Sequence, residues 1–301
     1  MKSTLILFTA LLLAPLAALH ADDNTSKRAD KRESRAQTPP PTHPPLEPAD
    51  VTKFPEGVQR VDLYLLMGQS NMKGRGMMPD EPKRDSRIVM MHLKDDHWYL
   101  ARHPLHLTGD AKTFAGHDNA GVGPGLSFAE TLIADNPKVR VGLIPCAVGG
   151  SRIALWQQGA KLYDDALRRA KLALQTTAPV KGRICGVLWL QGEADSAADR
   201  RAAYETKLLK LIDDLRADLS TPDLPFIACT IGEMGESDRV ADKAAINAIL
   251  LSLPSKRPHT ACVDARDLKG NIGDNVHFDT ASQNAIGRGF AEQMKKLAGP
   301  Q

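Results

Sequence analysis

Five short apolar runs, rich in valine, isoleucine and leucine, recur along the chain and alternate with segments of helical periodicity. The runs cover residues 58–67, 139–146, 184–190, 226–231 and 260–263. Apolar runs of this length are typical of strands that are buried on both faces of a sheet. Strands that alternate with helices form a parallel sheet through right-handed crossovers. The sequence therefore predicts an α/β protein in three layers, with helices on both faces of a parallel sheet of about five strands.

The helices between these runs are predicted from apolar residues that recur every three or four positions. The clearest face comprises Tyr204, Leu208, Leu211, Ile212, Leu215 and Leu219. Further helices are predicted at 126–134, 162–174, 240–253 and 281–297. The stretch 77–123 breaks the alternation. There we expect a small hairpin, formed by 87–93 and 97–101, and a long loop of the kind that carries ligand contacts.

Residues 1–56 differ in character from the rest of the chain. A positively charged start, an apolar run over 5–19 and the small residue Ala21 form a signal peptide pattern over 1–21. The run is short for a transmembrane span, so we expect no membrane insertion after processing. Residues 22–56 mix charges with prolines and hold few apolar side chains, which predicts a disordered Pro-rich linker. We therefore expect a secreted or periplasmic protein whose folded domain is 57–301.

Charge and cysteine usage exclude several classes of function. The formal net charge is only +3, so nothing indicates a nucleic-acid or anionic-membrane partner. The cysteines lie in or beside predicted strands, as small buried residues do, and are Cys146, Cys185, Cys229 and Cys262. Export would permit their oxidation, although no pairing follows from the sequence. His103 and His106 lack a third ligand at a suitable spacing, so we expect no metal.

The first apolar run ends at Gly68 and is followed by Gln-Ser-Asn. This order places Ser70 at the carboxyl edge of the predicted sheet, where open parallel sheets bind their ligands. A serine needs a base and an oxyanion site to act as a nucleophile. Asp274 and His277, three residues apart in one turn, can provide a carboxylate–imidazole pair for that purpose.

Oxyanion donors are expected at the same edge of the sheet. The backbone N–H of Ser70 and that of Gly149 or Gly150 can point at a developing oxyanion, because glycine allows the backbone to approach closely. The side-chain amide of Gln191, which follows the third apolar run, can add a further N–H.

Five ordered blocks give the chain a specific resemblance. They are GQSNMKGRG from Gly68, GVGPGLSFA at 121–129, GLIPCAVGGSRI at 142–153, GVLWLQGEAD at 186–195 and DNVHFD at 274–279. From about residue 61 to the C-terminus the chain resembles the SGNH hydrolase superfamily. Within that superfamily it is similar to carbohydrate esterase family six and the sialate O-acetylesterase group.

The resemblance implies a flavodoxin-like three-layer fold and hydrolysis of acetyl esters on sugars without metal or cofactor. It implies that Ser70 is the nucleophile, His277 the base and Asp274 the acid that orients it. It also implies that the oxyanion donors are Ser70, a glycine and Gln191. Gly149 and Gly150 both fit the glycine, and Gly123 is a third possibility.

Five further residues are candidates for substrate binding or for support of the site. They are Gln69, Asn71, Arg75, Glu193 and Trp156. Glu193 is expected to brace the site by hydrogen bonding and Asp195 to cap the following helix, although the two carboxylates could also form a glycosidase pair. Arg75 fits substrate contact and a surface ion pair equally well. Trp156 fits a platform for a sugar ring and a core position equally well.

The sequence as a whole favours an exported serine esterase that removes O-acetyl groups from carbohydrate. Acetylated xylan, another polysaccharide and a sialic acid all fit as substrate, and the oligomeric state stays open. One alternative is an esterase or thioesterase for lipid or other acyl groups, which would require an extended apolar groove. The other is a non-catalytic sugar-binding module built on a hydrolase scaffold.

Overall fold

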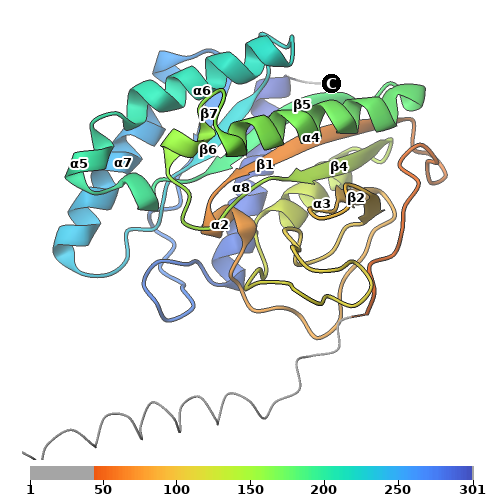
Figure 1. Cartoon of the computed structure of the whole chain (residues 1–301), viewed down its shortest axis with the longest axis horizontal. Helices are drawn as coiled ribbons and strands as arrows, with labels where there is room; N and C mark the ends of the chain where they lie inside the picture. The colour runs from red at the N-terminus through yellow and green to blue at the C-terminus, as the bar shows by residue number, and fades with distance from the viewer. Residues whose placement is uncertain (1–43, 300–301) are drawn as a thin grey trace, which may run out of the picture. The chain divides into compact units, whose positions relative to one another are not determined.

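A seven-stranded sheet lies at the centre of the computed structural model, which describes residues 44–299 (Figure 1). The strands are β1 (Arg60–Gly68), β2 (Ile88–Met91), β3 (Trp98–Leu100), β4 (Val139–Pro145), β5 (Arg183–Leu190), β6 (Phe226–Cys229) and β7 (Thr260–Val263). Their order is β3-β2-β4-β1-β5-β6-β7, and every neighbouring pair is parallel except β2 with β3. The parallel strands therefore end at one edge, with the end of β1 at its middle.

Helices cover both faces of this sheet. α3 (Gly125–Asp135) and α8 (Thr280–Ala298) pack on one face, and α4 (Lys161–Thr177), α6 (Tyr204–Asp218) and α7 (Ser237–Lys256) pack on the other. The short pieces are α2 (Ser70–Lys73), α5 (Ala198–Arg201) and 3-10 turns at Ile153–Trp156, Ala178–Val180 and Glu193–Asp195. The predicted three-layer α/β/α fold is confirmed.

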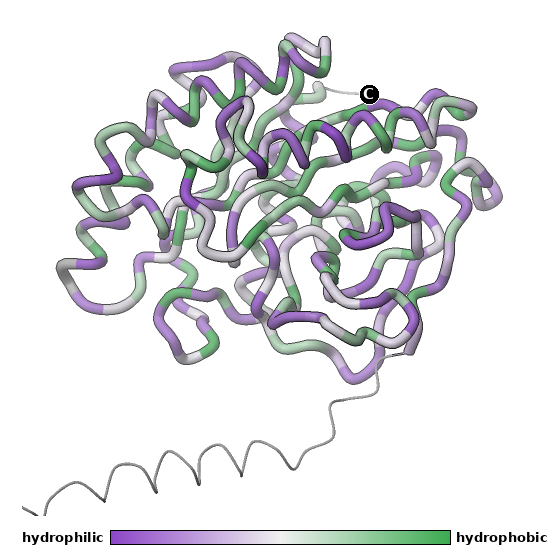
Figure 2. The backbone as a smooth tube through the Cα atoms, viewed as in Figure 1, coloured by the Kyte–Doolittle hydropathy of each residue, from purple (hydrophilic) through white to green (hydrophobic). Residues whose placement is uncertain are grey.

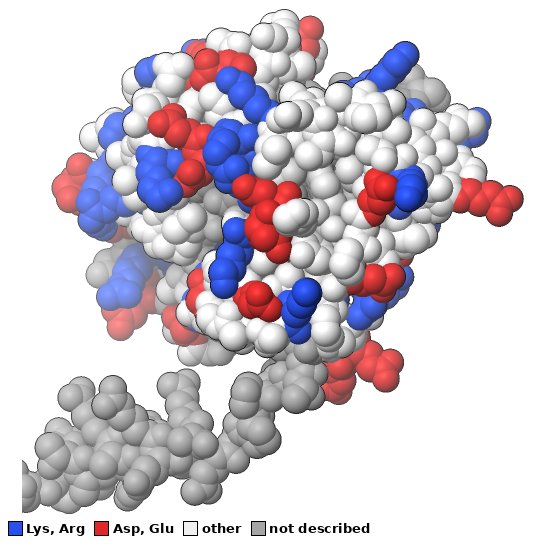
Figure 3. Space-filling model, turned by 45° about the vertical axis from the view of Figure 1, so that its right-hand side comes forward, with Lys and Arg blue, Asp and Glu red and all other residues white. Residues whose placement is uncertain are grey.

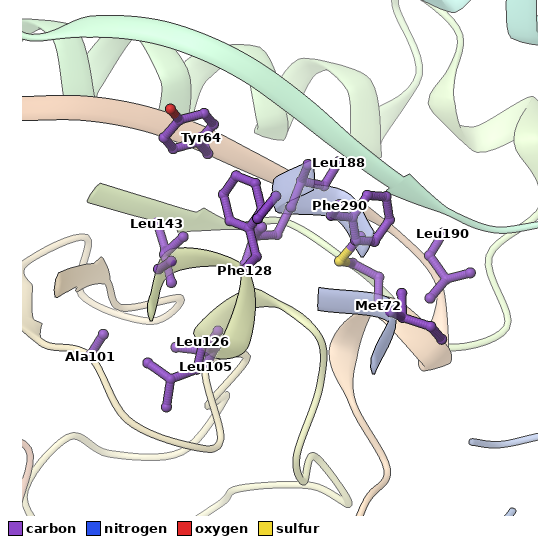
Figure 4. Close-up of a cluster of buried hydrophobic side chains, with 14 of the residues drawn as sticks. Tyr64, Met72, Ala101, Leu105, Leu126, Phe128, Leu143, Leu188, Leu190 and Phe290 are labelled. Atoms are coloured by element: carbon purple, nitrogen blue, oxygen red, sulfur yellow. The ribbon is translucent and has the colours of Figure 1, made fainter. Parts of the chain in front are cut away.

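The sheet separates two apolar cores. Successive residues of β1 point to opposite faces, so that Leu65 belongs to one core and Leu66 to the other. On the side of α3 and α8, Phe128 and Phe290 pack over the sheet, and Met72 of α2 reaches Phe290 (Figure 4). Burial on both faces explains why the strands are almost uniformly hydrophobic in Figure 2, while the helices carry polar residues on their outer sides.

The predicted hairpin forms as β2 and β3, but it belongs to the main sheet. Val89 of β2 lies opposite Gly142 of β4 in a parallel register, and all four β2 residues are buried. The sheet therefore has seven strands where about five are predicted. The strand that buries β2 lies beyond α3 in the chain, so no local pattern indicates this pairing.

The predicted boundary of the linker is wrong, because residues 44–56 pack against the domain. The side chains of Leu46 and Val51 are each only 4% exposed. The N–H of Leu100 donates to the carbonyl of Glu47 at 2.9 Å, and the N–H of Ala49 donates to the carbonyl of Trp98 at 2.9 Å. These bonds cover β3, which is an edge strand with otherwise unpaired backbone groups. The described domain therefore begins at Pro44 and not at Gly57.

The predicted signal peptide over 1–21 and the remainder of the predicted linker, 22–43, lie outside the described residues. Within residues 44–299, none of the helices combines the length and the apolar character that a membrane crossing requires.

The segment between β3 and α3 buries several basic side chains. Residues 101–124 contain turns and one isolated bridge, yet Arg102 and His106 are each 1% exposed and His103 is 8% exposed. Burial disfavours the charged form of a histidine. It lowers the pKa of His103 to about 4 and that of His106 to about 3. Both rings are therefore neutral in the folded protein at neutral pH.

These two histidines make the fold sensitive to acid. In the unfolded chain each ring takes up a proton near pH 6.5, whereas in the folded chain it does so only near pH 4 or 3. Their contribution to stability is complete above pH 6.5 and is lost as the pH falls from 6.5 towards 4. The free energy of unfolding should fall by up to about 1.4 kcal/mol per pH unit for each ring.

Urea unfolding between pH 7 and pH 5 measures this slope, in a range where most carboxylates remain ionised. The double variant His103→Gln/His106→Gln should show a clearly shallower slope. His97→Gln is the matched control, because the His97 side chain is 78% exposed. An equally steep slope in the double variant would assign the acid sensitivity to other groups.

Candidate active site

Ser70 lies where β1 ends, at the middle of the carboxyl edge. The strand stops at Gly68, whose φ of +135° and contact with β5 both require glycine, because a Cβ there would lie 2.2 Å from the carbonyl oxygen of Leu190. Ser70 then opens α2. Its Oγ lies 2.8 Å from Nε2 of His277, and Nδ1 of His277 lies 2.6 Å from Oδ2 of Asp274. The three residues that the sequence predicts to be catalytic thus form one hydrogen-bonded chain.

Asp274 is held in its ionised form. Its Oδ1 accepts the backbone N–H groups of Val276 at 3.0 Å and His277 at 2.9 Å. Partial burial acts to raise the pKa of Asp274, but the hydrogen bonds from the His277 side chain and from these amides lower it to about 2. An ionised Asp274 keeps the proton of His277 on Nδ1. Nε2 is then the acceptor that faces Ser70.

Asn71 joins the serine turn to the histidine loop. Its Nδ2 donates to the carbonyl of Val276 at 3.1 Å, and its Oδ1 accepts the N–H of Phe278 at 3.0 Å. These two groups flank His277 in the chain. Nδ2 also donates to Oε1 of Glu193 at 2.5 Å, which sets the orientation of the amide. Asn71, itself 0% exposed, therefore positions the histidine backbone relative to Ser70.

Glu193 braces this arrangement from the end of β5, as its predicted supporting role requires. Burial raises the pKa of its carboxyl group. Asp195 does not cap the following helix, and it does not face the serine. Its Oδ2 accepts the N–H of Ile153 at 2.8 Å and Nε2 of Gln191 at 2.6 Å. Glu193 and Asp195 consequently do not form a pair of opposed catalytic carboxylates.

Gln191 does not occupy the predicted oxyanion position. Its side chain is 0% exposed, and its Nε2 donates to the carbonyl of Ser151 at 3.1 Å as well as to Asp195. Both donor hydrogens are thus used within the fold. The residue ties the end of β5 to the loop after β4, which is a structural role.

Gln69 is better placed than Gln191 to face a reacting ester. It lines the cleft around Ser70, and its Oε1 accepts the N–H of Ala194 at 3.3 Å. That bond orients the side chain, and its amide nitrogen has no partner among residues 44–299. The sequence analysis names Gln69 only as a supporting residue, because nothing in the local pattern distinguishes its orientation from that of Gln191.

The glycine turn after β4 lies beside Ser70. The N–H of Ser151 donates to the carbonyl of Val148 at 3.3 Å, and Gly150, at the third position of the turn, has a φ of +70°. Such a turn favours glycine at that position. A Cβ on Gly149 would lie 3.9 Å from the Cβ of Ser70. Gly149 is thus the glycine adjacent to the serine.

Gly123, the third candidate, lies elsewhere. Its Cα packs against Gly74 and the carbonyl of Met72. It helps to fix the backbone that follows α2, and it is not beside Ser70.

Trp156 is a core residue and not a platform for sugar. Its side chain is 0% exposed and packs edge-on against Trp189, with ring centroids 5.5 Å apart. Its Nε1 donates to Oγ of Ser151 at 3.1 Å. Trp156 therefore supports the glycine turn from below.

The site opens into a cleft of about 870 Å³. Its lining includes Ser70, His277, Gly149, Gly150 and Gln69, together with residues of the segment between β3 and α3. Thr108, Asp118 and Asn119 come from that segment, which agrees with the predicted role of the long loop. Asp118 forms an ion pair with Lys73, a buried cleft residue that the sequence analysis did not single out. The block GQSNMKGRG contains Lys73, but its spacing gives no sign of that partner.

Arg75 also lines the cleft and is partly buried. Within residues 44–299 it forms no ion pair, so the surface ion pair that the sequence allows is not present. Among the described residues, no group of three or more His, Cys, Asp or Glu side chains is arranged to hold a metal ion.

The three-layer fold, with this serine at the carboxyl edge, defines an SGNH-type hydrolase scaffold. Residues 60–296 match the family described as carbohydrate esterase, sialic acid-specific acetylesterase. A probable carbohydrate esterase of Arabidopsis thaliana is 32% identical over 249 residues, which cover 76% of this chain and 88% of that protein. The chain belongs to this family of carbohydrate esterases, and the resemblance stated from the five sequence blocks is confirmed.

Solved structures agree with this assignment. The X-ray structure of an Arabidopsis thaliana protein has a TM-score of 0.66 at 31% identity and covers 77% of this chain and 97% of that one. NanS has a TM-score of 0.64 at 19% identity, with coverage of 80% and 98%. A carbohydrate acetylesterase from Xanthomonas citri has a TM-score of 0.57 at 20% identity, with coverage of 79% and 56%. At these lower identities the last two support the fold alone.

Asn71→Ala should lower kcat by about 10², because His277 would lose the two backbone bonds that hold it in line with Ser70. Asn247→Ala is a closely matched control. Asn247 is also buried, bonds the N–H and carbonyl of Ile231 and donates to Glu233, but its contacts do not include the histidine loop. Both variants should lose stability, by about 1–3 kcal/mol, because buried polar groups are left unpaired. Equal kcat losses in the two would show that Asn71 acts only through stability.

Proposed function

We propose that the protein is a serine esterase that removes O-acetyl groups from carbohydrate through Ser70, His277 and Asp274. The hydrogen-bonded chain from Asp274 to Ser70 at the floor of the cleft carries this proposal. A serine, an imidazole and a carboxylate in that order are the groups that acyl transfer requires. Membership of the carbohydrate esterase family supplies the class of substrate.

In the first half of the reaction, Oγ of Ser70 attacks the ester carbonyl carbon while Nε2 of His277 takes the serine proton. The C–O bond to the sugar then breaks, and His277 returns the proton to the leaving sugar oxygen. In the second half, His277 removes a proton from water, and the resulting attack on the acetyl-enzyme releases acetate and restores Ser70. The ionised Asp274 stabilises the imidazolium that forms in each half.

Three donors are proposed for the oxyanion. The N–H of Ser70 opens α2, and the first amides of a helix have no partner within it. Gly149 supplies a second N–H from the turn beside the serine. The amide nitrogen of Gln69 is the third, in place of Gln191. Donors of this kind stabilise the transition state more than the bound ester.

The lining of the cleft favours a sugar over a long acyl chain. Lys73, Arg75, Thr108, Asp118 and Asn119 give it hydrogen-bonding groups. A lipid esterase would need an extended apolar groove in their place. The partly buried Arg75 further favours a sugar that carries a carboxylate, such as a sialic acid, over a neutral sugar.

The surface agrees with a small polar substrate. Acidic and basic side chains are interspersed over the face drawn in Figure 3, without an extended patch of either sign. Nucleic acids are bound through large basic surfaces, so this distribution does not support such a partner. Export, predicted from residues 1–21, would bring the enzyme to glycans outside the cytoplasm.

Ser70→Ala tests the proposed function. The variant should fold normally and lose activity towards nitrophenyl acetate and acetylated sugars by about 10³ or more in kcat. Ser252→Ala on α7 is the control, because Oγ of Ser252 only donates to the carbonyl of Ile249 within the helix. Acetate release that persists in Ser70→Ala would reject the serine mechanism, and a wild-type protein without acetate release would support a binding module.

The two glutamines separate an oxyanion donor from a structural residue. Gln69→Ala should lower kcat by about 10²–10³ with little change in Tm, because it removes a donor used mainly in the transition state. Gln191→Ala should lower Tm markedly, because Asp195 and the carbonyl of Ser151 lose their partner. Measuring kcat and Tm for both variants decides the matter. The opposite pattern would return the oxyanion role to Gln191.

A further inference from the structure

A second cavity, of about 480 Å³, adjoins the catalytic cleft. The two spaces share two lining residues, Glu193 and Val276. On its far side the second cavity is lined by the loops that follow β5 and β6, and Asp274 and Asn275 of the histidine loop form its near wall. It therefore continues the catalytic cleft along the same edge of the sheet, with Val276 as the ridge between them.

The combined length of the two spaces exceeds a single sugar ring. The catalytic cleft begins beside Leu93, just after β2, and the second cavity ends beside Met234, after β6. Four strand intervals separate β2 from β6. At about 4.8 Å per interval the edge spans about 19 Å. A monosaccharide would leave part of this length empty, whereas a short oligosaccharide would occupy it.

The lining of the second cavity suits hydroxyl groups. Cationic donors from Arg200, Arg239 and Lys243 lie among acceptors from Glu236 and Asp242. The mixture has no dominant sign, so it does not favour an anion such as phosphate. Sugar hydroxyls both donate and accept, and they match such a mixture. Arg200 and Glu193 each also carry a buried polar atom, Nε and Oε2, without a partner among the described residues. Such atoms are typical of a site that a polar ligand or water completes.

The proposed chemistry places the sugar on this side of the serine. His277 must protonate the leaving sugar oxygen, so the sugar that carries the ester lies against Nε2 of His277. The loop that holds His277 is also the wall of the second cavity. The remainder of a glycan attached to that sugar is therefore directed over Val276 towards Arg200.

We propose that the second cavity is a subsite for a further sugar residue, so that the enzyme acts on O-acetylated oligosaccharides in preference to free monosaccharides. This inference rests on the proposed esterase function. It adds a specificity site outside the catalytic groups, with Arg200 as the residue that hydrogen-bonds the further sugar.

Kinetics on substrates of different length test the subsite. Two pairs of probes are used: O-acetylated xylose with O-acetylated xylotetraose, and free O-acetylated sialic acid with its lactose-linked form. In the series that the wild type hydrolyses, kcat/KM should be about tenfold higher for the longer substrate, as one charged hydrogen bond provides. The difference should appear in KM, because the further sugar is bound equally in the ground state and the transition state.

Two variants locate the effect in the second cavity. Arg200→Ala should raise KM for the longer substrate by about tenfold and bring the ratio of long to short substrate close to one. Ala197→Trp, which fills the cavity from another lining residue, should do the same without removing a charge. Arg257→Ala is the matched control, because Arg257 pairs with Asp213 away from both spaces and should leave the ratio unchanged.

The outcomes distinguish the subsite from the esterase function itself. If the wild type releases acetate from sugars but shows no preference for length, the subsite is rejected and the proposed function stands. A length preference that both cavity variants retain would also reject it. If no acetylated sugar is hydrolysed at all, the proposed function fails together with the inference that rests on it.

Discussion

The side-chain amide of Asn71 is the contact on which the active site depends. A serine and a histidine that are 207 residues apart must meet within hydrogen-bonding distance. A single bond between their side chains would not hold the two loops, since each loop is free to shift its backbone. Asn71 adds a donor and an acceptor that engage the main chain on both sides of His277, and Glu193 prevents the amide from turning over. The geometry of the reacting atoms is thus set by backbone contacts.

Buried charge and buried neutrality divide the site into two parts. Asp274 lies where hydrogen bonds from amides and from His277 keep its pKa low, so that it remains an anion. In the segment that forms the opposite wall of the cleft, His103 and His106 have only burial to shift their pKa values, and they remain neutral. The same kind of ring therefore serves as a proton carrier in one place and as a core residue in another. The hydrogen-bonding surroundings decide between the two.

Support for the oxyanion region comes from behind the cleft. Trp156, Gln191 and Asp195 all contact the stretch from Ser151 to Ile153, and none of them lines the cleft. Their contacts hold the turn that brings Gly149 to the serine. Sequence motifs place these residues next to catalytic ones, which is why Gln191 and Trp156 resemble site residues in a linear reading. Their position one layer deeper becomes visible only when the strands are packed.

Local pattern alone determined the parallel α/β architecture, the helices and the serine, aspartate and histidine, because apolar runs, periodicity and short motifs depend on neighbours in the chain. The tertiary structure decided the features that depend on distant partners. It joined β2 and β3 to the sheet, and it covered β3 with residues 44–56, whose composition resembles that of a linker. It also turned Gln191 inward and Gln69 towards the cleft. A glutamine can point either way from a strand end, and only the available hydrogen-bond partners settle which way it points.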